Sequence, residues 1–282
     1  YLAKVCSLVD VSNLKPMKIV IDAGNGMAQV SLPKLLEKFP VEVEYLYLEP
    51  DGTFPNHEAN PLKEDTLKDL QEKVRSVGAT IGFALDGDAD RSGLVDENGE
   101  VVPASYVGGL VGLELLKVHP QAHMLYDLRT SRSVKEAWER EGATTEMCKV
   151  GHANIKKMMK DTGSVFASEL SLHLYYQDMY DVESSDLSLV LILKILSESG
   201  KSLSELWKSL HTYAHSGEIN FHVENSNDLI EKIRQRFSDA SISELDGVLF
   251  EYPDYWISVR KSNTEPVLRL NVEAHSEKKM RE

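Results

Sequence analysis

The stretch "MKIVIDAGNG", residues 17–26, decides the fold because its apolar run ends in a glycine turn, which is typical of a buried strand that leads into a helix. Around it the sequence predicts an alternation of elements: a strand at 17–26, a helix at 27–39 with Pro33 in its first turns, a strand at 41–50, a helix at 60–78 and a strand at 79–88. This βαβαβ order predicts a parallel or mixed sheet covered by helices, with ligands at the carboxyl ends of the strands.

The rest of the sequence repeats this alternation and then changes. A hairpin at 92–103 and a helix from Ala104 precede these elements: strands at 123–130, 144–150 and 164–171 and helices at 133–142, 153–163, 185–200 and 202–214. Beyond them, long strands surround one helix at 229–238. We therefore predict an α/β protein of two successive α/β domains with mixed sheets covered by helices, followed by a smaller α+β domain, at 1–102, 103–214 and 215–282.

Composition restricts the possible partners. The 282 residues, 42% of them hydrophobic, are enough for cores in two or three domains, and the net charge of −14 argues against nucleic-acid and anionic-membrane partners. Cys6 and Cys148 are too few for a disulfide framework. No apolar run approaches the ~20 residues of a membrane span, so we expect a soluble cytoplasmic protein.

Three aspartates follow the predicted strand at 79–88. Asp86, Asp88 and Asp90 stand at alternate positions in "GFALDGDADRSG", directly before Arg91. Carboxylates that converge in this way repel each other unless a cation lies between them. A hard cation beside a guanidinium suits a phosphoryl group, and Mg²⁺ fits best, with further oxygens from a phosphate or from water.

The three aspartates allow two other interpretations. An EF-hand loop would place Asp86 first and Glu97 last, but its sixth position requires glycine and here is Arg91, and the flanking sequence predicts a strand and a hairpin instead of helices. A solvated acidic turn remains an alternative from the residues alone.

Five further motifs accompany "DGDADR" in a fixed order along the chain: "IDAGNGMA" (21–28), "PDGTFPNHEANP" (50–61), "VGHANIKKMMK" (150–160), "SELSLHLYY" (168–176) and "RKSNTEPVLRLNVEA" (260–274). Together they resemble the α-D-phosphohexomutases, above all the branch that includes bacterial phosphomannomutase/phosphoglucomutase. The resemblance implies that Asp86, Asp88 and Asp90 bind Mg²⁺ beside a catalytic Arg91. It also implies that the last domain is TATA-binding-protein-like.

The motif "SELSLHLYY" places Glu169, Ser171 and His173 on one face of a predicted strand. From the residues alone, the polar face of an edge strand is an equally good interpretation. The resemblance implies that this set binds sugar hydroxyls. Ser168 stands where the family has glycine and Leu172 where it has glycine or alanine, so both add bulk beside the sugar.

The motif "RKSNTEPVLRL" predicts a turn whose backbone N–H groups and side chains hold a phosphate, although a plain surface turn has the same signature. The resemblance implies that these residues bind the phosphate that is not transferred: Arg260, Ser262, Asn263, Thr264 and Arg269.

The resemblance adds two residues from other motifs. His152 matches a substrate-contacting, catalytic histidine of the family, although a lone histidine before a helix is more often a cap. Arg129 stands where the family commonly has lysine and keeps the positive charge for substrate binding. We interpret Asp22 and Asn25 as residues that stabilise a turn.

The family's chemistry uses a phosphoserine in an N-terminal domain, and no Thr-Ala-Ser-His-Asn-Pro-like motif occurs in this sequence, which begins with Tyr1. We therefore interpret the chain as the second, third and fourth domains of a Mg²⁺-dependent phosphohexomutase, with its phosphosugar substrate and the missing N-terminal domain as partners. As a fragment it is expected to be inactive. The alternative is a non-catalytic phosphosugar- or metal-binding module. Glucose and mannose phosphates are not distinguished by the sequence.

Overall fold

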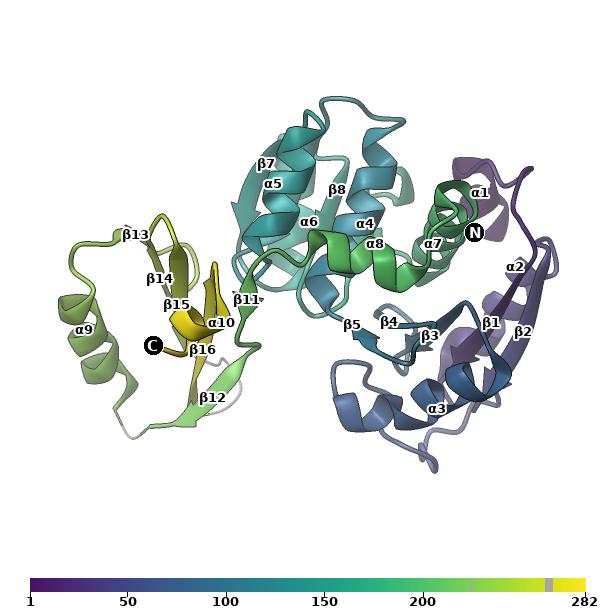
Figure 1. Cartoon of the computed structure of the whole chain (residues 1–282), viewed down its shortest axis with the longest axis horizontal. Helices are drawn as coiled ribbons and strands as arrows, with labels where there is room; N and C mark the ends of the chain where they lie inside the picture. Colours follow the sequence, from purple (N-terminus) through teal and green to yellow (C-terminus); the bar gives the residue numbers. More distant parts are fainter. Residues whose placement is uncertain (224, 262–265) are drawn as a thin grey trace.

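The computed structural model describes residues 1–223, 225–261 and 266–282. Its described residues form three sheets, one in each of three successive units (Figure 1). In the first α/β unit, β1 lies between β2 and β3 and is parallel to both, and β4 and β5 continue the sheet antiparallel beyond β3. The strands are β1 (Met17–Asp22), β2 (Val41–Leu46), β3 (Ile81–Leu85), β4 (Ser92–Asp96) and β5 (Val101–Val102).

The helices of the first unit are shorter than the sequence predicts. The predicted helix at 27–39 is divided at Ser31, and Pro33 lies in the first turn of its second part. The glycine stop is confirmed, because Gly78 ends its helix with φ +63°. The helical segments are α1 (Leu2–Leu8), which was not predicted, η1 (Met27–Val30), α2 (Leu32–Leu36), η2 (Glu64–Leu67) and α3 (Lys68–Val77).

The second α/β unit has the same strand order as the first. Strand β6 lies between β7 and β8 and is parallel to both, and β9 and β10 continue antiparallel beyond β8. The strands are β6 (His123–Asp127), β7 (Thr144–Cys148), β8 (Phe166–Ser168), β9 (Leu174–Tyr176) and β10 (Val182–Glu183). The helices are α4 (Ala104–Leu116), α5 (Arg132–Arg140), α6 (His152–Thr162), η3 (Gln177–Met179), α7 (Ser185–Ser199) and α8 (Leu203–Leu210).

The end of one predicted strand is wrong. The strand predicted at 164–171 ends at Ser168, and residues 169–173 form a turn between β8 and β9. Leu172 has φ +72°, which an extended strand does not allow, and its N–H donates to the Glu169 carbonyl at 3.0 Å. Glu169, Ser171 and His173 therefore do not alternate along a strand.

The two α/β units share a core. Helices α4 and α7 are apolar around most of their circumference, as expected of interior helices, and they contact each other. A single cluster of buried side chains extends from Ile19 and Phe83 in the first unit to Trp138 and Phe166 in the second. Because burial of apolar area stabilises this contact, the two units are held in a defined relative position.

The C-terminal unit, at the left of Figure 1, is an antiparallel sheet with its own core. Both β11 and β12 pair with β16, which continues through β15 and β14 to β13. The elements are β11 (Ala214–His215), β12 (Ile219–His222), α9 (Ser226–Arg236), β13 (Ser241–Ser243), β14 (Val248–Glu251), β15 (Tyr255–Lys261), β16 (Val267–Ala274) and α10 (Glu277–Arg281). The predicted fold class is confirmed.

Among the residues that the structure describes, no helix combines the length and the apolar character that are needed to cross a membrane.

Candidate functional site

The aspartate loop (residues 86–91) joins β3 to β4 at the carboxyl end of β3, where the sequence predicts a ligand site. One carboxylate oxygen from each of Asp86, Asp88 and Asp90 lies within 4.8 Å of the other two, so the three side chains could hold one cation. Asp86 is buried, whereas Asp88 is exposed. The loop is flanked by strands β3 and β4, whereas an EF-hand loop is flanked by helices.

Arg91 is fixed by the first aspartate. Its Nε lies 2.6 Å from Asp86 Oδ2, and its Nη1 lies 3.3 Å from Asn60 Oδ1. The backbone N–H groups of Asp90 and Arg91 donate to Asp86 Oδ1, both at 3.1 Å. Asp86 therefore orients the loop, while Asp88 is exposed and Asp90 is half-buried.

The glycine turn after β1 supports the same loop. The Met27 N–H donates to the Gly87 carbonyl at 2.9 Å, and a Cβ placed on Gly26 would lie 2.6 Å from that carbonyl oxygen. Only glycine permits this approach. The Asp22 carboxylate accepts the Gly24 N–H at 2.9 Å, and Asn25 donates to the Glu49 carbonyl at 2.8 Å, so both act as the predicted turn residues.

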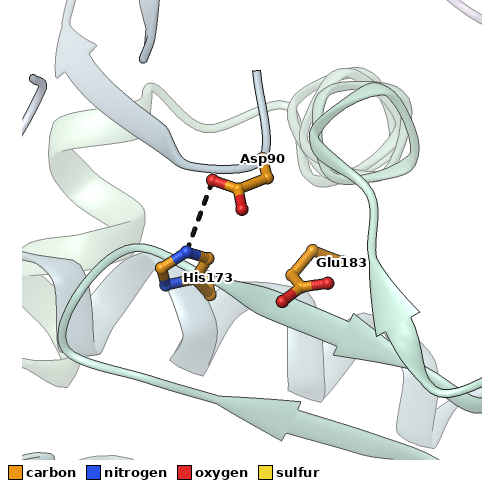
Figure 2. A group of neighbouring side chains, drawn as sticks. All are labelled: Asp90, His173 and Glu183. Carbon is orange, nitrogen blue, oxygen red and sulfur yellow. Dashed lines mark ion pairs between the residues drawn. The ribbon is translucent and has the colours of Figure 1, made fainter. Parts of the chain in front are cut away.

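The Glu–Ser–His turn (residues 169–173) of the second unit contacts the aspartate loop. Ser171 Oγ lies 2.7 Å from His173 Nδ1, and His173 Nε2 lies 3.3 Å from Asp90 Oδ1 (Figure 2). The Ser92 N–H donates to the Leu172 carbonyl at 3.2 Å. The side chains predicted for the cation and for the sugar are therefore neighbours, although the strand predicted for the second set is a turn.

The ion pairs of this contact change three pKa values. Burial alone would lower the pKa of His173, but its hydrogen bonds to Asp90 and Glu169 outweigh burial and raise the pKa to about 9. The hydrogen bond from His173 lowers the pKa of Asp90. Burial would raise the pKa of Glu169, but hydrogen bonds from His173 and Tyr175 and the charge of Arg129 lower it to about 2. At neutral pH these residues are charged.

Asp90 also belongs to a second group that could hold a cation. Ligand atoms of Asp90, His173 and Glu183 lie within 4.8 Å of one another (Figure 2). Glu183 is already paired with Lys156, whose Nζ lies 2.8 Å from its Oε2. The aspartate loop offers carboxylates alone, which suits Mg²⁺ better than a group that contains an imidazole.

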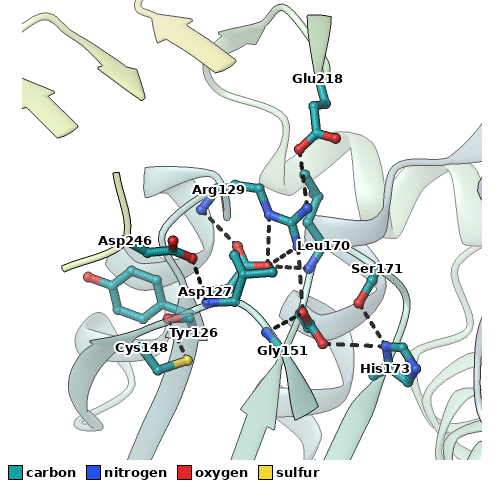
Figure 3. Close-up of polar contacts among 12 residues, drawn as sticks. Tyr126, Asp127, Arg129, Cys148, Gly151, Leu170, Ser171, His173, Glu218 and Asp246 are labelled. Atoms are coloured by element: carbon teal, nitrogen blue, oxygen red, sulfur yellow. Dashed lines mark hydrogen bonds and ion pairs between the residues drawn. The ribbon is translucent and has the colours of Figure 1, made fainter. Parts of the chain in front are cut away.

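Arg129 contacts Glu169 of the Glu–Ser–His turn and is almost fully buried. Its Nη2 lies 2.7 Å from Asp127 Oδ2 and 3.7 Å from Glu169 Oε1 (Figure 3). The same Glu169 Oε1 accepts the Gly151 N–H at 3.0 Å. His152 follows Gly151 as the first residue of α6, with an exposed side chain.

Arg260 and Arg269 are cross-strand neighbours on β15 and β16. Together with Arg129 they form the arginine cluster, because all three guanidinium groups contact the carboxylate of Glu218 between β11 and β12. The structure thus brings together three arginines from two units. Ser262, Asn263 and Thr264, which the sequence assigns to the same phosphate, lie outside the described residues.

The two departures from the family pattern point away from the polar side chains. Ser168 is buried against α4, where a Cβ placed on Gly108 would lie 2.4 Å from its Oγ. Leu172 is also buried, and its Cδ1 packs near Gly93 of the first unit. The predicted added bulk is therefore accommodated by glycines of neighbouring elements.

Three residues near these side chains were not predicted: Asn60, His57 and Glu218. His57 Nε2 lies 3.0 Å from Asp22 Oδ2, and this hydrogen bond raises the pKa of His57 to about 9 despite partial burial. The motif "PDGTFPNHEANP" contains both His57 and Asn60, so its position in the family order was the available signal. In the sequence around Glu218, the glycine directly before it was the only local feature that could have drawn attention to this residue.

Comparison with known proteins agrees with this arrangement. Residues 1–99, 104–213 and 218–282 match the models for phosphoglucomutase/phosphomannomutase alpha/beta/alpha domain II, alpha/beta/alpha domain III and C-terminal domain. A phosphomannomutase of Methanocaldococcus jannaschii is 41% identical over 94% of this chain and 59% of its own length. A phosphomannomutase/phosphoglucomutase of Pseudomonas aeruginosa is 36% identical over 96% of this chain and 60% of its own length.

A solved structure gives the same result in three dimensions. The phosphoglucomutase/phosphomannomutase family protein of Burkholderia thailandensis superposes with a TM-score of 0.90 and 31% identity, over 100% of this chain and 61% of that one. The chain thus spans about 60% of the length of these relatives. On the family models, the relatives and the common fold, the chain belongs to the phosphoglucomutase/phosphomannomutase family.

Proposed function

We propose that this chain carries the cation, sugar and phosphate sites of a Mg²⁺-dependent phosphohexomutase, which interconverts hexose 1-phosphate and hexose 6-phosphate of mannose, glucose or both. The observation that carries the proposal is the contact between the aspartate loop and the Glu–Ser–His turn, with His173 Nε2 3.3 Å from Asp90 Oδ1. A cation at the first and a sugar at the second would be neighbours. A phosphoryl group between them would reach both.

The aspartate loop fits Mg²⁺ because its oxygens are hard ligands and its three carboxylates converge within 4.8 Å. Asp86, Asp88 and Asp90 would hold the ion, which would neutralise charge on the phosphoryl oxygens. Arg91 would bind the same phosphoryl group, since Asp86 fixes its Nε and leaves the guanidinium partly exposed.

The other sites would hold the substrate in place. Glu169 is ionised and can accept hydrogen bonds from sugar hydroxyls, and Ser171 can donate or accept. The arginine cluster would bind the phosphate that is not transferred, and His152 would contact the substrate from the start of α6.

The phosphoryl donor would be a phosphoserine outside these 282 residues. In the first step a hydroxyl oxygen of the hexose phosphate would form a bond to phosphorus, the serine O–P bond would break, and the serine oxygen would gain a proton as the sugar hydroxyl loses one. The resulting hexose bisphosphate would reorient and return its other phosphoryl group to the serine. Residues of this chain would position both reactions.

The test compares this chain with the same chain extended by an N-terminal domain that carries the serine. Both are assayed with glucose 1-phosphate, Mg²⁺ and glucose 1,6-bisphosphate, and calorimetry measures the binding of glucose 1-phosphate to each. We expect both to bind the sugar phosphate and only the extended chain to turn it over. Equal turnover by the short chain would refute the external donor, and binding without turnover by both would favour the non-catalytic module.

A further inference from the structure

Glu218 owes its direction to an irregularity in the C-terminal sheet. Along β16, Ser216 bonds to Val272, whereas Ile219 pairs with Leu270. Glu218 and the glycine before it therefore face a single residue of β16, which is a β-bulge. A bulge changes the direction of a side chain, and here it directs the carboxylate to the junction of the C-terminal unit with the second α/β unit.

The carboxylate of Glu218 contacts every member of the arginine cluster. Its Oε2 lies 3.3 Å from Arg129 Nη1 and 3.4 Å from Arg260 Nη2, and its Oε1 lies 3.2 Å from Arg269 Nη1. Each oxygen thus accepts from guanidinium groups, as the oxygens of a bound phosphate would. Figure 3 shows Glu218 reaching Arg129 from the side opposite Asp127.

Carboxylates already accompany the arginines of the cluster. Among the described residues, Asp127 and Glu169 lie beside Arg129, and Glu218 lies beside all three guanidinium groups. A phosphate that enters the cluster would bring two further negative charges next to the Glu218 carboxylate. Like charges at such distances repel strongly in a partly buried site, so phosphate and Glu218 compete for the same arginines.

We propose that Glu218 is a positioning residue that acts as an internal counter-ion: it holds the arginine cluster in place until the substrate phosphate displaces it. This inference rests on the proposed function, which assigns the cluster to the phosphate that is not transferred. The competition lowers the affinity for phosphate, and the same carboxylate favours release of the product. It also links the C-terminal unit to the second α/β unit through Arg129 when no phosphate is bound.

The experiment measures the Kd of inorganic phosphate and of glucose 1-phosphate by calorimetry, for the wild-type chain, Glu218→Gln, Glu218→Asp and Glu251→Gln. The last is a matched control, because Glu251 pairs with Arg132 at 3.4 Å at the same junction and, among the described residues, forms no ion pair with a member of the cluster. Thermal unfolding without ligand shows whether each variant is folded.

We expect Glu218→Gln to bind both ligands about ten-fold more tightly, because removal of a like charge favours the anion by about 1.4 kcal/mol or more. Glu218→Asp keeps the charge on a shorter side chain and should give an intermediate Kd, and Glu251→Gln should match the wild type.

Weaker or unchanged binding by Glu218→Gln would overturn the inference, because it would mean that Glu218 only orients the arginines. If Glu218→Gln does not fold, a Glu218→Asp affinity at or below the wild-type value would overturn it equally. Failure of the wild-type chain and all variants to bind would instead refute the phosphate site of the proposed function, and the inference with it.

Discussion

The aspartate loop and the Glu–Ser–His turn occupy the same place in two sheets of the same strand order, and they contact each other. Each begins with a buried carboxylate, Asp86 or Glu169, directly after the third strand of its unit. Each turn closes when an N–H from a residue with positive φ donates to the carbonyl of that acid, from Ala89 at 3.2 Å and from Leu172 at 3.0 Å. The backbone is therefore nearly the same in both.

The difference lies in the side chains that follow. The first loop adds Asp88 and Asp90, which concentrate negative charge that only a cation relieves. The second adds Ser171 and His173, which supply hydrogen-bond donors beside one carboxylate. In the proposed function, one kind of turn would bind a cation in one unit and hydroxyl groups in the other, and the choice between them would depend on a few residues.

The first strands of the two α/β units, β1 and β6, show a second contrast. Asp22 ends β1 and Asp127 ends β6, and each accepts the N–H two residues later, at 2.9 Å and 2.7 Å. The partner of Asp22 is His57, whereas the partner of Asp127 is Arg129. Equivalent positions are therefore stabilised by a histidine, whose pKa the hydrogen bond to Asp22 raises to about 9, in one unit and by a permanent cation in the other.

The largest expected effect concerns these two aspartates. Asp127→Asn should lower the free energy of unfolding by about 3–5 kcal/mol, because it removes the charge that neutralises a buried guanidinium. Asp22→Asn should cost only about 1–2 kcal/mol, since His57 can lose its proton. Urea denaturation of both variants at neutral pH measures the difference. Equal losses would show that the two positions are energetically equivalent.

The second prediction separates the two cation groups. Asp88→Ala should weaken Mg²⁺ binding about 10- to 100-fold, as expected when a charged ligand is lost. Asp88 is exposed, so the fold should not change. Glu183→Gln is the control and should leave Mg²⁺ affinity unaltered. Calorimetry that finds the loss in Glu183→Gln instead would place the ion at Asp90, His173 and Glu183.

Much of this contrast could be predicted from the sequence. The apolar run into Asp86 predicts a strand end with a charged loop, and the observed β3 ends at Leu85. Arg91 at the position that an EF-hand reserves for glycine excluded that motif, and β3 and β4 do flank the loop. These features are local, and the physical rules that produce them act over a few residues.

Other features were not predictable in this way. Alternate polar residues at Glu169, Ser171 and His173 have the period of a strand, but a tight turn also brings alternate residues together. Glu218 was missed because Arg129 and Arg260 lie 89 and 42 residues away in sequence. Such contacts depend on how two units pack, which periodicity does not report.

The third prediction tests whether the two turns have separate functions. Glu169→Gln should weaken glucose 1-phosphate binding about ten-fold through loss of a charged hydrogen bond, with Mg²⁺ affinity unchanged. Asp88→Ala should weaken Mg²⁺ binding and leave glucose 1-phosphate binding unchanged when the latter is measured without metal. Calorimetry of both ligands on both variants gives the four values. A loss of both affinities in either variant would mean that the turns act as one site.

The smallest expected effect is the pH dependence that His57 adds in the first unit. The folded-state pKa of His57 is about 9, above its ordinary value of 6.5, because of the hydrogen bond to Asp22. A raised pKa stabilises the fold fully below the unfolded-state value, and the contribution is lost as the pH rises through 9. Between about pH 6 and pH 10 the wild type should therefore lose about 1 kcal/mol more stability than His57→Gln.

In the second unit, Arg129 keeps its charge over this range. Asp127→Asn should therefore be less stable than the wild type at every pH, and its stability should change with pH at the same slope. Urea denaturation at several pH values measures these slopes. Parallel curves for the wild type and His57→Gln would mean that His57 and Asp22 are not paired in solution.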